Sequence, residues 1–264
     1  MLGLNRIASL VPLLTLLTIP TSAHFIPNNP IQPNTDTTHS HSQFPFPNNL
    51  TTPRTNHESA DRGSIIPLTT REHWMRQTLV ALNASGLPCP FYPFAAAVVN
   101  HTGSNNNGPG PGELICTGIN SGRQSGNMML HGEVAAIINC TAILQDPQGR
   151  FRLSPAETIA AFAEFSLYTN AESCPMCASA IRWNGFKEYI YGTSIDTLVE
   201  YGFAQITISS EEIFNAAEGL PSSTSLLGGV LTGQTDALFA WQFDDAHPCP
   251  RGCARAEEGS CTSV

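Results

Sequence analysis

Helical patterns alternate with short apolar runs along most of this chain, and this alternation limits the fold more than any other feature. Strands are predicted at 94–100, which is a continuous apolar run, and at 113–118, 165–169, 189–192 and 205–208. Segments with helical periodicity or helix-start signals separate several of them. Because such elements bury their apolar faces by stacking in layers, their order predicts an α/β sandwich around one sheet.

The expected helices begin at start signals that can be read from the sequence. A Thr-x-x-Glu capping box opens the first one, which is expected over 69–85 with Thr69 at the N-cap. A second helix is expected over 131–144. A Ser-Pro pair at 154–155 marks a third start, and a further helix is expected over 175–183, immediately after a cysteine.

The two ends of the chain differ from its body. Residues 1–23 combine an early arginine, an apolar run and a small-residue end, which is typical of a cleaved signal peptide rather than a membrane anchor. Residues 24–63 are rich in Pro, Asn, Thr, Ser and His and predict a disordered segment. A folded domain is expected over 64–246, followed by a cysteine-containing tail over 247–264. We therefore expect a secreted protein, without membrane association once the signal peptide is removed.

Sequons and cysteines agree with export to an oxidising compartment. Four N-x-[ST] sequons are present, at Asn49, Asn83, Asn100 and Asn139, so we expect a glycoprotein. Of the eight cysteines, six could form disulfides, and the sequence does not choose among the pairings. A bond from the tail to the body, for example through Cys249, could hold a pocket-closing segment in place.

The charge balance limits the partners. The chain has 12 Lys and Arg residues against 21 Asp and Glu residues, and its formal net charge is −9. Proteins that grip nucleic acid by neutralising phosphates need a basic face, and none is visible in this sequence. We therefore expect a small-molecule substrate and no nucleic-acid partner.

Two short motifs supply side chains typical of a metal site. His-Gly-Glu at 131–133 stands at the start of one expected helix, and Cys-Pro-Met-Cys at 174–177 stands at a strand-to-helix junction. One imidazole and two thiolates provide three ligands for a tetrahedral zinc and leave the fourth position for water. The two cysteines share a first helical turn, where their sulfurs can converge and the helix dipole favours thiolates.

A carboxylate accompanies the three candidate ligands. Glu133 lies two residues beyond His131, where it can reach a zinc-bound water rather than the metal. Zinc lowers the pKa of such a water to about 7, and a nearby carboxylate can carry protons to a ring nitrogen and a leaving amine. Two other interpretations stay open. A thiol–disulfide oxidoreductase would use Cys174 and Cys177 but leaves His131 unexplained, and a catalytically silent zinc-containing binding or effector protein leaves Glu133 without a task.

In this order, the motifs match the His-x-Glu and Cys-x-x-Cys pattern of zinc deaminases. The stretch 93–201 resembles the cytidine/deoxycytidylate deaminase superfamily, nearest its cytosine deaminase, guanine deaminase and tRNA adenosine deaminase group. The apolar strand at 93–99, Leu-His-Gly-Glu-Val at 130–134 and the strand-helix unit at 167–181 carry the resemblance. It implies a three-layer α-β-α sandwich around a mixed five-stranded sheet, with a homodimer as a candidate assembly.

The resemblance also implies roles for individual residues. His131, Cys174 and Cys177 would bind Zn²⁺, and Glu133 would be the proton shuttle. Substrate contacts would come from Asn120, Ser173, Trp241 and Asp244. Ser173 stands where the family usually has proline, and this is the main departure from the pattern. The implied activity is hydrolytic deamination of a free nucleobase or nucleoside, cytosine- or guanine-like, through attack of zinc-bound hydroxide on the amino-bearing ring carbon and release of ammonia.

Overall fold

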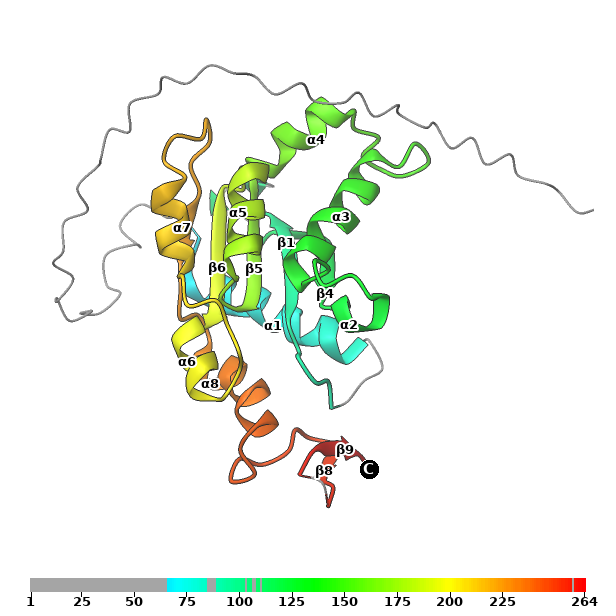
Figure 1. Ribbon diagram of the computed structural model, residues 1–264. Helices are drawn as coiled ribbons and strands as arrows, with labels where there is room; N and C mark the ends of the chain where they lie inside the picture. Colours follow the sequence, from blue (N-terminus) through cyan, green and yellow to red (C-terminus); the bar gives the residue numbers. More distant parts are fainter. Residues whose placement is uncertain (1–65, 85–88, 103, 106–107, 110, 258) are drawn as a thin grey trace, which may run out of the picture. The chain divides into compact units, whose positions relative to one another are not determined.

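The structure is a computed structural model that describes residues 66–84, 89–102, 104–105, 108–109, 111–257 and 259–264 (Figure 1). The signal peptide predicted at 1–23 and the low-complexity segment predicted at 24–63 lie outside the described residues. Among the described helices, none is both long enough and apolar enough to cross a membrane.

A mixed five-stranded sheet forms the centre of the fold. Its strands are β1 (Ala95–Asn100), β4 (Glu113–Ile119), β5 (Phe165–Ala171), β6 (Glu188–Thr193) and β7 (Ser225–Leu227). They follow the order β4-β1-β5-β6-β7. The first two pairings are antiparallel, and β5-β6 and β6-β7 are parallel.

Helices cover both faces of this sheet. α1 (Leu68–Ala84) packs on one face, and α3 (Gly132–Gln145) and α5 (Pro175–Asn184) lie on the other (Figure 1). Successive residues of β1 alternate between the two cores: Val98 packs with the α3 and α5 layer, and Val99 packs with the α1 layer. Burial on both faces explains why the strand is continuously apolar. The expected α-β-α sandwich is confirmed.

The remaining elements connect or extend these layers. They are β2 (Ser104–Asn105), β3 (Gly108–Pro109), α2 (Gly122–Ser125), α4 (Pro155–Phe162), α6 (Ile195–Glu200), α7 (Ser210–Ala216), α8 (Thr232–Thr235), the 3-10 helices Asp236–Leu238 and Ala240–Gln242, β8 (Cys253–Arg255) and β9 (Cys261–Ser263). The predicted start of α4 is confirmed, because Ser154 and Glu157 form a reciprocal capping box there.

Two sequence predictions about elements were wrong. The run 205–208 is not a strand, and the alternating Ile206 and Ile208 are 61% and 42% exposed. The fifth strand of the sheet is instead β7, which pairs with β6 in parallel. Two parallel neighbours need a crossover connection between them, and α7 is part of that connection. Thr69 is not an N-cap: α1 begins one residue earlier, and the Pro67 carbonyl accepts hydrogen bonds from the N–H groups of Thr70 and Arg71 (3.0 and 3.1 Å).

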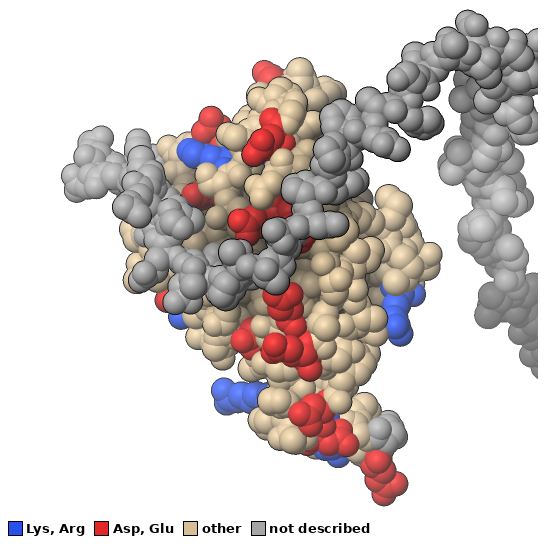
Figure 2. Space-filling model, turned by 60° about the vertical axis from the view of Figure 1, so that its left-hand side comes forward, with Lys and Arg blue, Asp and Glu red and all other residues tan. Residues whose placement is uncertain are grey.

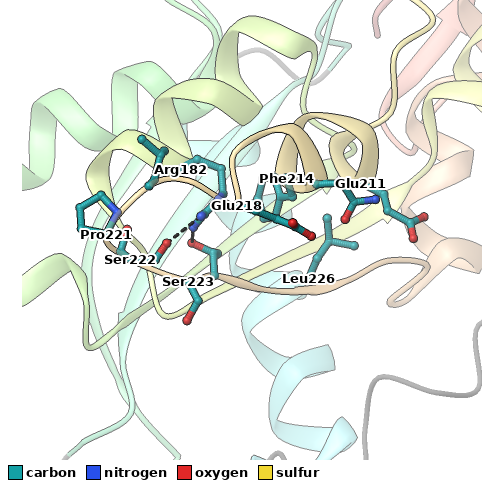
Figure 3. A pocket seen from close by; sticks show the side chains of 11 residues that line it. Arg182, Glu211, Phe214, Glu218, Pro221, Ser222, Ser223 and Leu226 are labelled. Atoms are coloured by element: carbon teal, nitrogen blue, oxygen red, sulfur yellow. Dashed lines mark hydrogen bonds between the residues drawn. The ribbon is translucent and has the colours of Figure 1, made fainter. Parts of the chain in front are cut away.

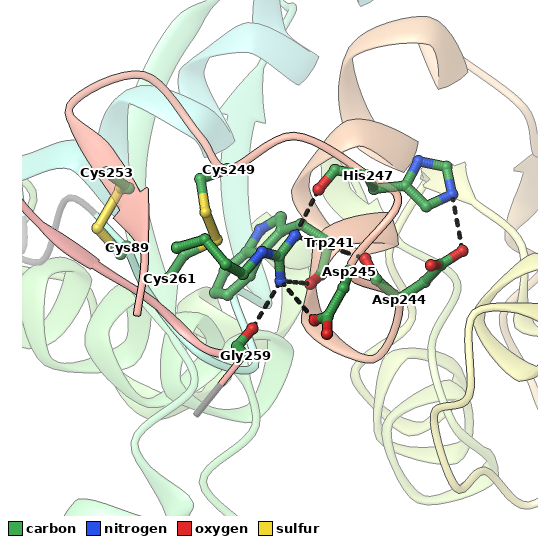
Figure 4. Close-up of a disulfide and its surroundings, with 10 residues drawn as sticks. Cys89, Trp241, Asp244, Asp245, His247, Cys249, Cys253, Gly259 and Cys261 are labelled. Atoms are coloured by element: carbon green, nitrogen blue, oxygen red, sulfur yellow. Dashed lines mark hydrogen bonds and ion pairs between the residues drawn. A yellow bond between two sulfur atoms is a disulfide. The ribbon is translucent and has the colours of Figure 1, made fainter. Parts of the chain in front are cut away.

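Three disulfides join the six cysteines outside the Cys-x-x-Cys motif. They are Cys89–Cys253, Cys116–Cys140 and Cys249–Cys261. The bond from the tail to the body therefore runs through Cys253 and not through Cys249, which pairs within the tail (Figure 4). Arg255 adds to this attachment, since its guanidinium donates to the carbonyls of Trp241 and Gly259 (3.0 and 2.7 Å).

Candidate metal centre

Two helix N-termini bring the candidate metal ligands together. His131 is the N-cap of α3 and Cys174 is the N-cap of α5, both in extended backbone conformation. Neither side chain forms a capping hydrogen bond with its own helix, so both remain available to bind a metal. Cys177 lies one turn into α5 and is fully buried.

The three candidate ligand atoms converge on one point. The atoms of His131, Cys174 and Cys177 that could bind a metal all lie within 4.8 Å of one another. Each sulfur is 3.6 Å from His131 Nδ1, and both cysteines are outside the disulfides. Two thiols and one imidazole in this arrangement form the donor set of a three-ligand zinc site, so the residues present fit this metal.

Hydrogen bonds favour the thiolate form of Cys174. The pKa of Cys174 is lowered to about 4, because its sulfur accepts hydrogen bonds from the Cys177 thiol and, less strongly, from His131. The position at a helix N-terminus acts in the same direction. The bond to Cys174 also raises the pKa of His131. A thiolate is the form of cysteine that binds metal.

A buried acid lies beside the three ligands. Glu133, in the first turn of α3, is only 7% exposed and lines the same cavity as His131 and Cys174. Burial raises the pKa of Glu133, and the hydroxyl of Ser173, which donates to its Oε1 at 2.7 Å, partly opposes this shift. The site therefore contains a carboxyl group that can exchange a proton next to the metal ligands.

The cluster opens into a cavity of about 260 Å³. The lining residues are Phe91, Tyr92, Phe94, Asn120, Arg123, Gln124, Met128, His131, Glu133, Glu172, Cys174, Ala204 and Gln205. Asn120 follows β4, and its Nδ2 donates to the Tyr92 carbonyl at 3.4 Å. Arg123 stacks over the Tyr92 ring, with its guanidinium carbon 4.6 Å from the ring centroid. The predicted Asn120 is thus brought to the candidate ligands.

Three other predicted substrate contacts lie outside this cavity lining. Ser173 is fully buried, and its hydroxyl contacts Glu133 instead. Trp241 is 2% exposed and lines a different cavity, together with Pro93 and Leu238. Asp244 lies in the segment before the tail, and its exposed carboxylate pairs with His247 at 3.6 Å (Figure 4).

Sequence reasoning missed the aromatic wall of the cavity. Phe91, Tyr92 and Phe94 come from the segment that leads into β1, and Phe91 is 45% exposed. The Pro-Phe-Tyr-Pro-Phe run at 90–94 was the available signal. Trp241 and Phe243 support this wall from behind, with ring centroids 6.3 and 5.7 Å from that of Phe91.

A larger cavity, of about 570 Å³, lies beside α7 (Figure 3). Arg182 reaches into it, but its guanidinium is occupied by the loop that follows α7, donating to Thr224 Oγ1 (2.9 Å) and to the Ser222 carbonyl (2.7 Å). Glu211 and Glu218 line the same hollow. In the described part of the chain, the one group of potential metal ligands is the His131 cluster, so the chemistry points to the smaller cavity.

The match with one family model agrees with this assignment. Residues 68–193 match the family model of the cytidine and deoxycytidylate deaminase zinc-binding region. A guanine deaminase from Nitrosomonas europaea has 20% identity over 67% of this chain and 85% of its own, with a TM-score of 0.43. A guanine deaminase from Bacillus subtilis has 21% identity over 56% of this chain and 94% of its own, with a TM-score of 0.36.

A third similar structure comes from work on A-to-I editing by tRNA:A34 deaminases at the wobble position. It has 20% identity over 63% of this chain and 98% of its own, with a TM-score of 0.42. A search of curated proteins gave no match. Residues 68–193 of this chain therefore carry the cytidine and deoxycytidylate deaminase zinc-binding region.

Proposed function

We propose that this chain is a zinc-dependent hydrolytic deaminase of a free nucleobase or nucleoside with a cytosine- or guanine-like ring. The observation that carries the proposal is the convergence of His131, Cys174 and Cys177 beside the buried Glu133 in one cavity. A structural zinc needs four protein ligands and no proton carrier, whereas this cluster offers three ligands and an adjacent acid.

Each residue has a separate task in this proposal. His131, Cys174 and Cys177 would hold zinc, which when bound supplies a Lewis acid and activates water. Glu133 would take one proton from the attacking water and deliver it to the ring nitrogen, and would then carry the second proton of that water to the amine, which leaves as ammonia. Asn120, on the same cavity wall, would hydrogen-bond the edge of the ring and fix its orientation.

The walls of the cavity suit a flat ring. Phe91, Tyr92 and Phe94 contribute aromatic rings to the lining, against which a base could pack. The volume of about 260 Å³ lies near the lower end of small-molecule sites, which run from roughly 300 to 1,000 Å³. This size favours a single base or nucleoside as the substrate.

Charge argues against a nucleic-acid substrate. The chain carries a net charge of −9, and Figure 2 shows acidic side chains spread over one face with few basic ones among them. Binding of nucleic acid depends on cations that neutralise phosphates.

Secretion is part of the proposal as well, and the three disulfides support an oxidising compartment. A homodimer is proposed as the assembly.

The test is ammonia release by the purified mature chain on cytosine, guanine, adenine and their nucleosides, with zinc content measured in parallel. Glu133→Ala is the test variant. Glu211→Ala is the matched control, because Glu211 is an exposed acid that lines the other cavity. We expect turnover of one base or its nucleoside, lost in Glu133→Ala and kept in Glu211→Ala, with zinc bound in all three proteins.

Two results would contradict the proposal. Zinc at one per chain without turnover of any compound would favour the catalytically silent binding protein. A protein without zinc, in which Cys174 and Cys177 are oxidised to a disulfide, would remove the basis of the metal centre and favour a redox function.

A further inference from the structure

Ser173 makes a direct contact with the acid of the candidate site. Its Oγ donates to Glu133 Oε1 at 2.7 Å, although the two residues are 40 positions apart. Ser173 is fully buried, and Glu133 is 7% exposed. A hydrogen bond to a carboxylate in such a place is stronger than one at the surface, because water competes little for either partner.

The backbone of Ser173 is held from two sides. Its N–H donates to Tyr189 Oη at 2.6 Å, and its carbonyl accepts from Ser210 Oγ at 3.1 Å. The preceding carboxylate, Glu172, accepts from the N–H groups of Ile195 and Ser210 (3.0 and 2.8 Å). The loop before Cys174 is therefore anchored to β6, α6 and α7, and the Ser173 hydroxyl is aimed at Glu133 by a rigid support.

The two contacts together require a residue that has both a backbone N–H group and a side-chain hydroxyl. A proline here would lack both the N–H group that donates to Tyr189 and the hydroxyl that donates to Glu133. The serine does not act as a helix cap, because the N-cap of α5 is Cys174 and no side chain caps it. Its hydroxyl is therefore fully available to Glu133.

We infer that Ser173 is a positioning residue for Glu133. Its hydroxyl fixes Oε1 of the carboxylate and so sets the direction in which the other oxygen meets the reacting atoms. This inference rests on the proposed function and deepens it. Residues that orient an acting group typically contribute about 10- to 100-fold to activity at metal sites.

The test compares Ser173→Ala and Ser173→Thr with wild type in the zinc-loaded full chain. We expect Ser173→Ala to keep one zinc per chain and to lose about 10- to 100-fold in kcat, with little change in KM, because orientation and not binding is lost. Ser173→Thr keeps the hydroxyl and should recover most of kcat. Unchanged kcat in Ser173→Ala, or a matching loss in Ser173→Thr, would overturn the inference.

A second measurement does not depend on activity. Thermal unfolding is recorded for Ser173→Ala in the wild-type and Glu133→Ala backgrounds. We expect Ser173→Ala to shift Tm in the wild type and to have a clearly different effect once Glu133 is absent, because the two side chains interact. Equal shifts in both backgrounds would overturn the inference. If the wild type released no ammonia from any substrate, the proposed function would fail. The difference between the two Tm shifts would then alone decide whether Ser173 holds Glu133 in place.

Discussion

Cys89 and Cys253 form a disulfide that joins the C-terminal hairpin to the segment leading into the cavity wall. Phe91 lies two residues beyond Cys89 and lines the cavity with Tyr92 and Phe94. The bond spans 164 residues of sequence, and Arg255 adds hydrogen bonds from the same hairpin to the Trp241 segment. The tail is therefore attached directly to the support of the aromatic wall.

Breaking this bond should loosen the wall without touching the metal ligands. Replacing both partners, Cys89→Ser with Cys253→Ser, should lower stability by about 2–5 kcal/mol, as loss of a native disulfide usually does. KM should rise more than kcat falls, because Phe91 contacts substrate in the proposal while His131 is unaffected. Denaturant unfolding, zinc content and steady-state kinetics would measure this.

The matched control is the double variant Cys249→Ser with Cys261→Ser. This disulfide spans only 12 residues and lies within the tail, so a smaller loss of stability and little change in KM are expected. An equal rise in KM in both double variants would show that the position of the bond does not matter, contrary to the prediction.

Much of the fold could be predicted because its signals are local. The strand segments at 94–100 and 165–169 are buried on both faces of the sheet, and the continuous apolar run at 94–99 is visible in the sequence. β7 has only three residues and forms because α7 returns the chain beside β6, which no local pattern indicates. Residues 205–208 alternate like a strand yet run exposed before α7.

The candidate site also combines features with local sequence signals and features that depend on tertiary structure. His131, Cys174 and Cys177 stand at helix starts, so their convergence follows from short motifs. The positions of Trp241 and Asp244 depend on the path of the chain after β7, and spacing across that stretch does not determine it. The hydroxyl of Ser173 finds Glu133 through tertiary contacts, which a single sequence does not reveal.

A buried ion pair gives a second prediction. Arg71 Nη2 lies 2.8 Å from Glu188 Oε1, and their side chains are only 5% and 9% exposed. Arg71→Met would leave the Glu188 carboxylate buried without this partner, which should cost about 3–5 kcal/mol of stability. Replacing both, Arg71→Met with Glu188→Leu, should recover much of this loss. Denaturant unfolding measures both.

The exposed pair Arg150 and Glu113 is the control for this comparison. Their side chains are 58% and 51% exposed, so Arg150→Met should change stability by about 0–1 kcal/mol. Similar losses of unfolding free energy in Arg71→Met and Arg150→Met would mean that burial does not determine how much the pair of Arg71 and Glu188 contributes to stability.

Stability should fall in mild acid because of His101. Burial lowers the pKa of His101 to about 4, a shift that Arg71 and Lys187 reinforce and Glu188 opposes. Since the folded-state pKa is below the unfolded value of 6.5, the neutral form is favoured in the fold. The stability from this residue is complete above pH 6.5 and is lost as the pH falls from 6.5 toward 4.

The variant His101→Gln isolates this contribution. Glutamine does not titrate and can still reach Tyr168, whose Oη lies 3.0 Å from His101 Nε2. Between about pH 7.5 and pH 5, Tm of the wild type should therefore fall by several degrees more than Tm of the variant. Parallel Tm curves for the two proteins would assign the acid sensitivity to other groups.

The close approach of α3 to β4 should be essential for the metal centre. A Cβ atom at Gly118 would lie 2.1 Å from the Ala136 nitrogen and 2.2 Å from the Gly132 carbonyl oxygen, and both are backbone atoms of α3. Gly118→Ala must therefore push this helix away from the sheet. Because His131 and Glu133 stand at the start of α3, the variant should bind less zinc and lose about 1–3 kcal/mol of stability or more.

Gly219→Ala is the matched control, since a Cβ atom there meets nothing within 4 Å. Zinc content by metal analysis and Tm should stay at wild-type values in this variant and fall together in Gly118→Ala. A Gly118→Ala protein with full zinc and reduced Tm would show that the ligands can adjust to a displaced α3. The convergence of His131 with Cys174 would then depend on the flexibility of the two helix starts rather than on tight packing against β4.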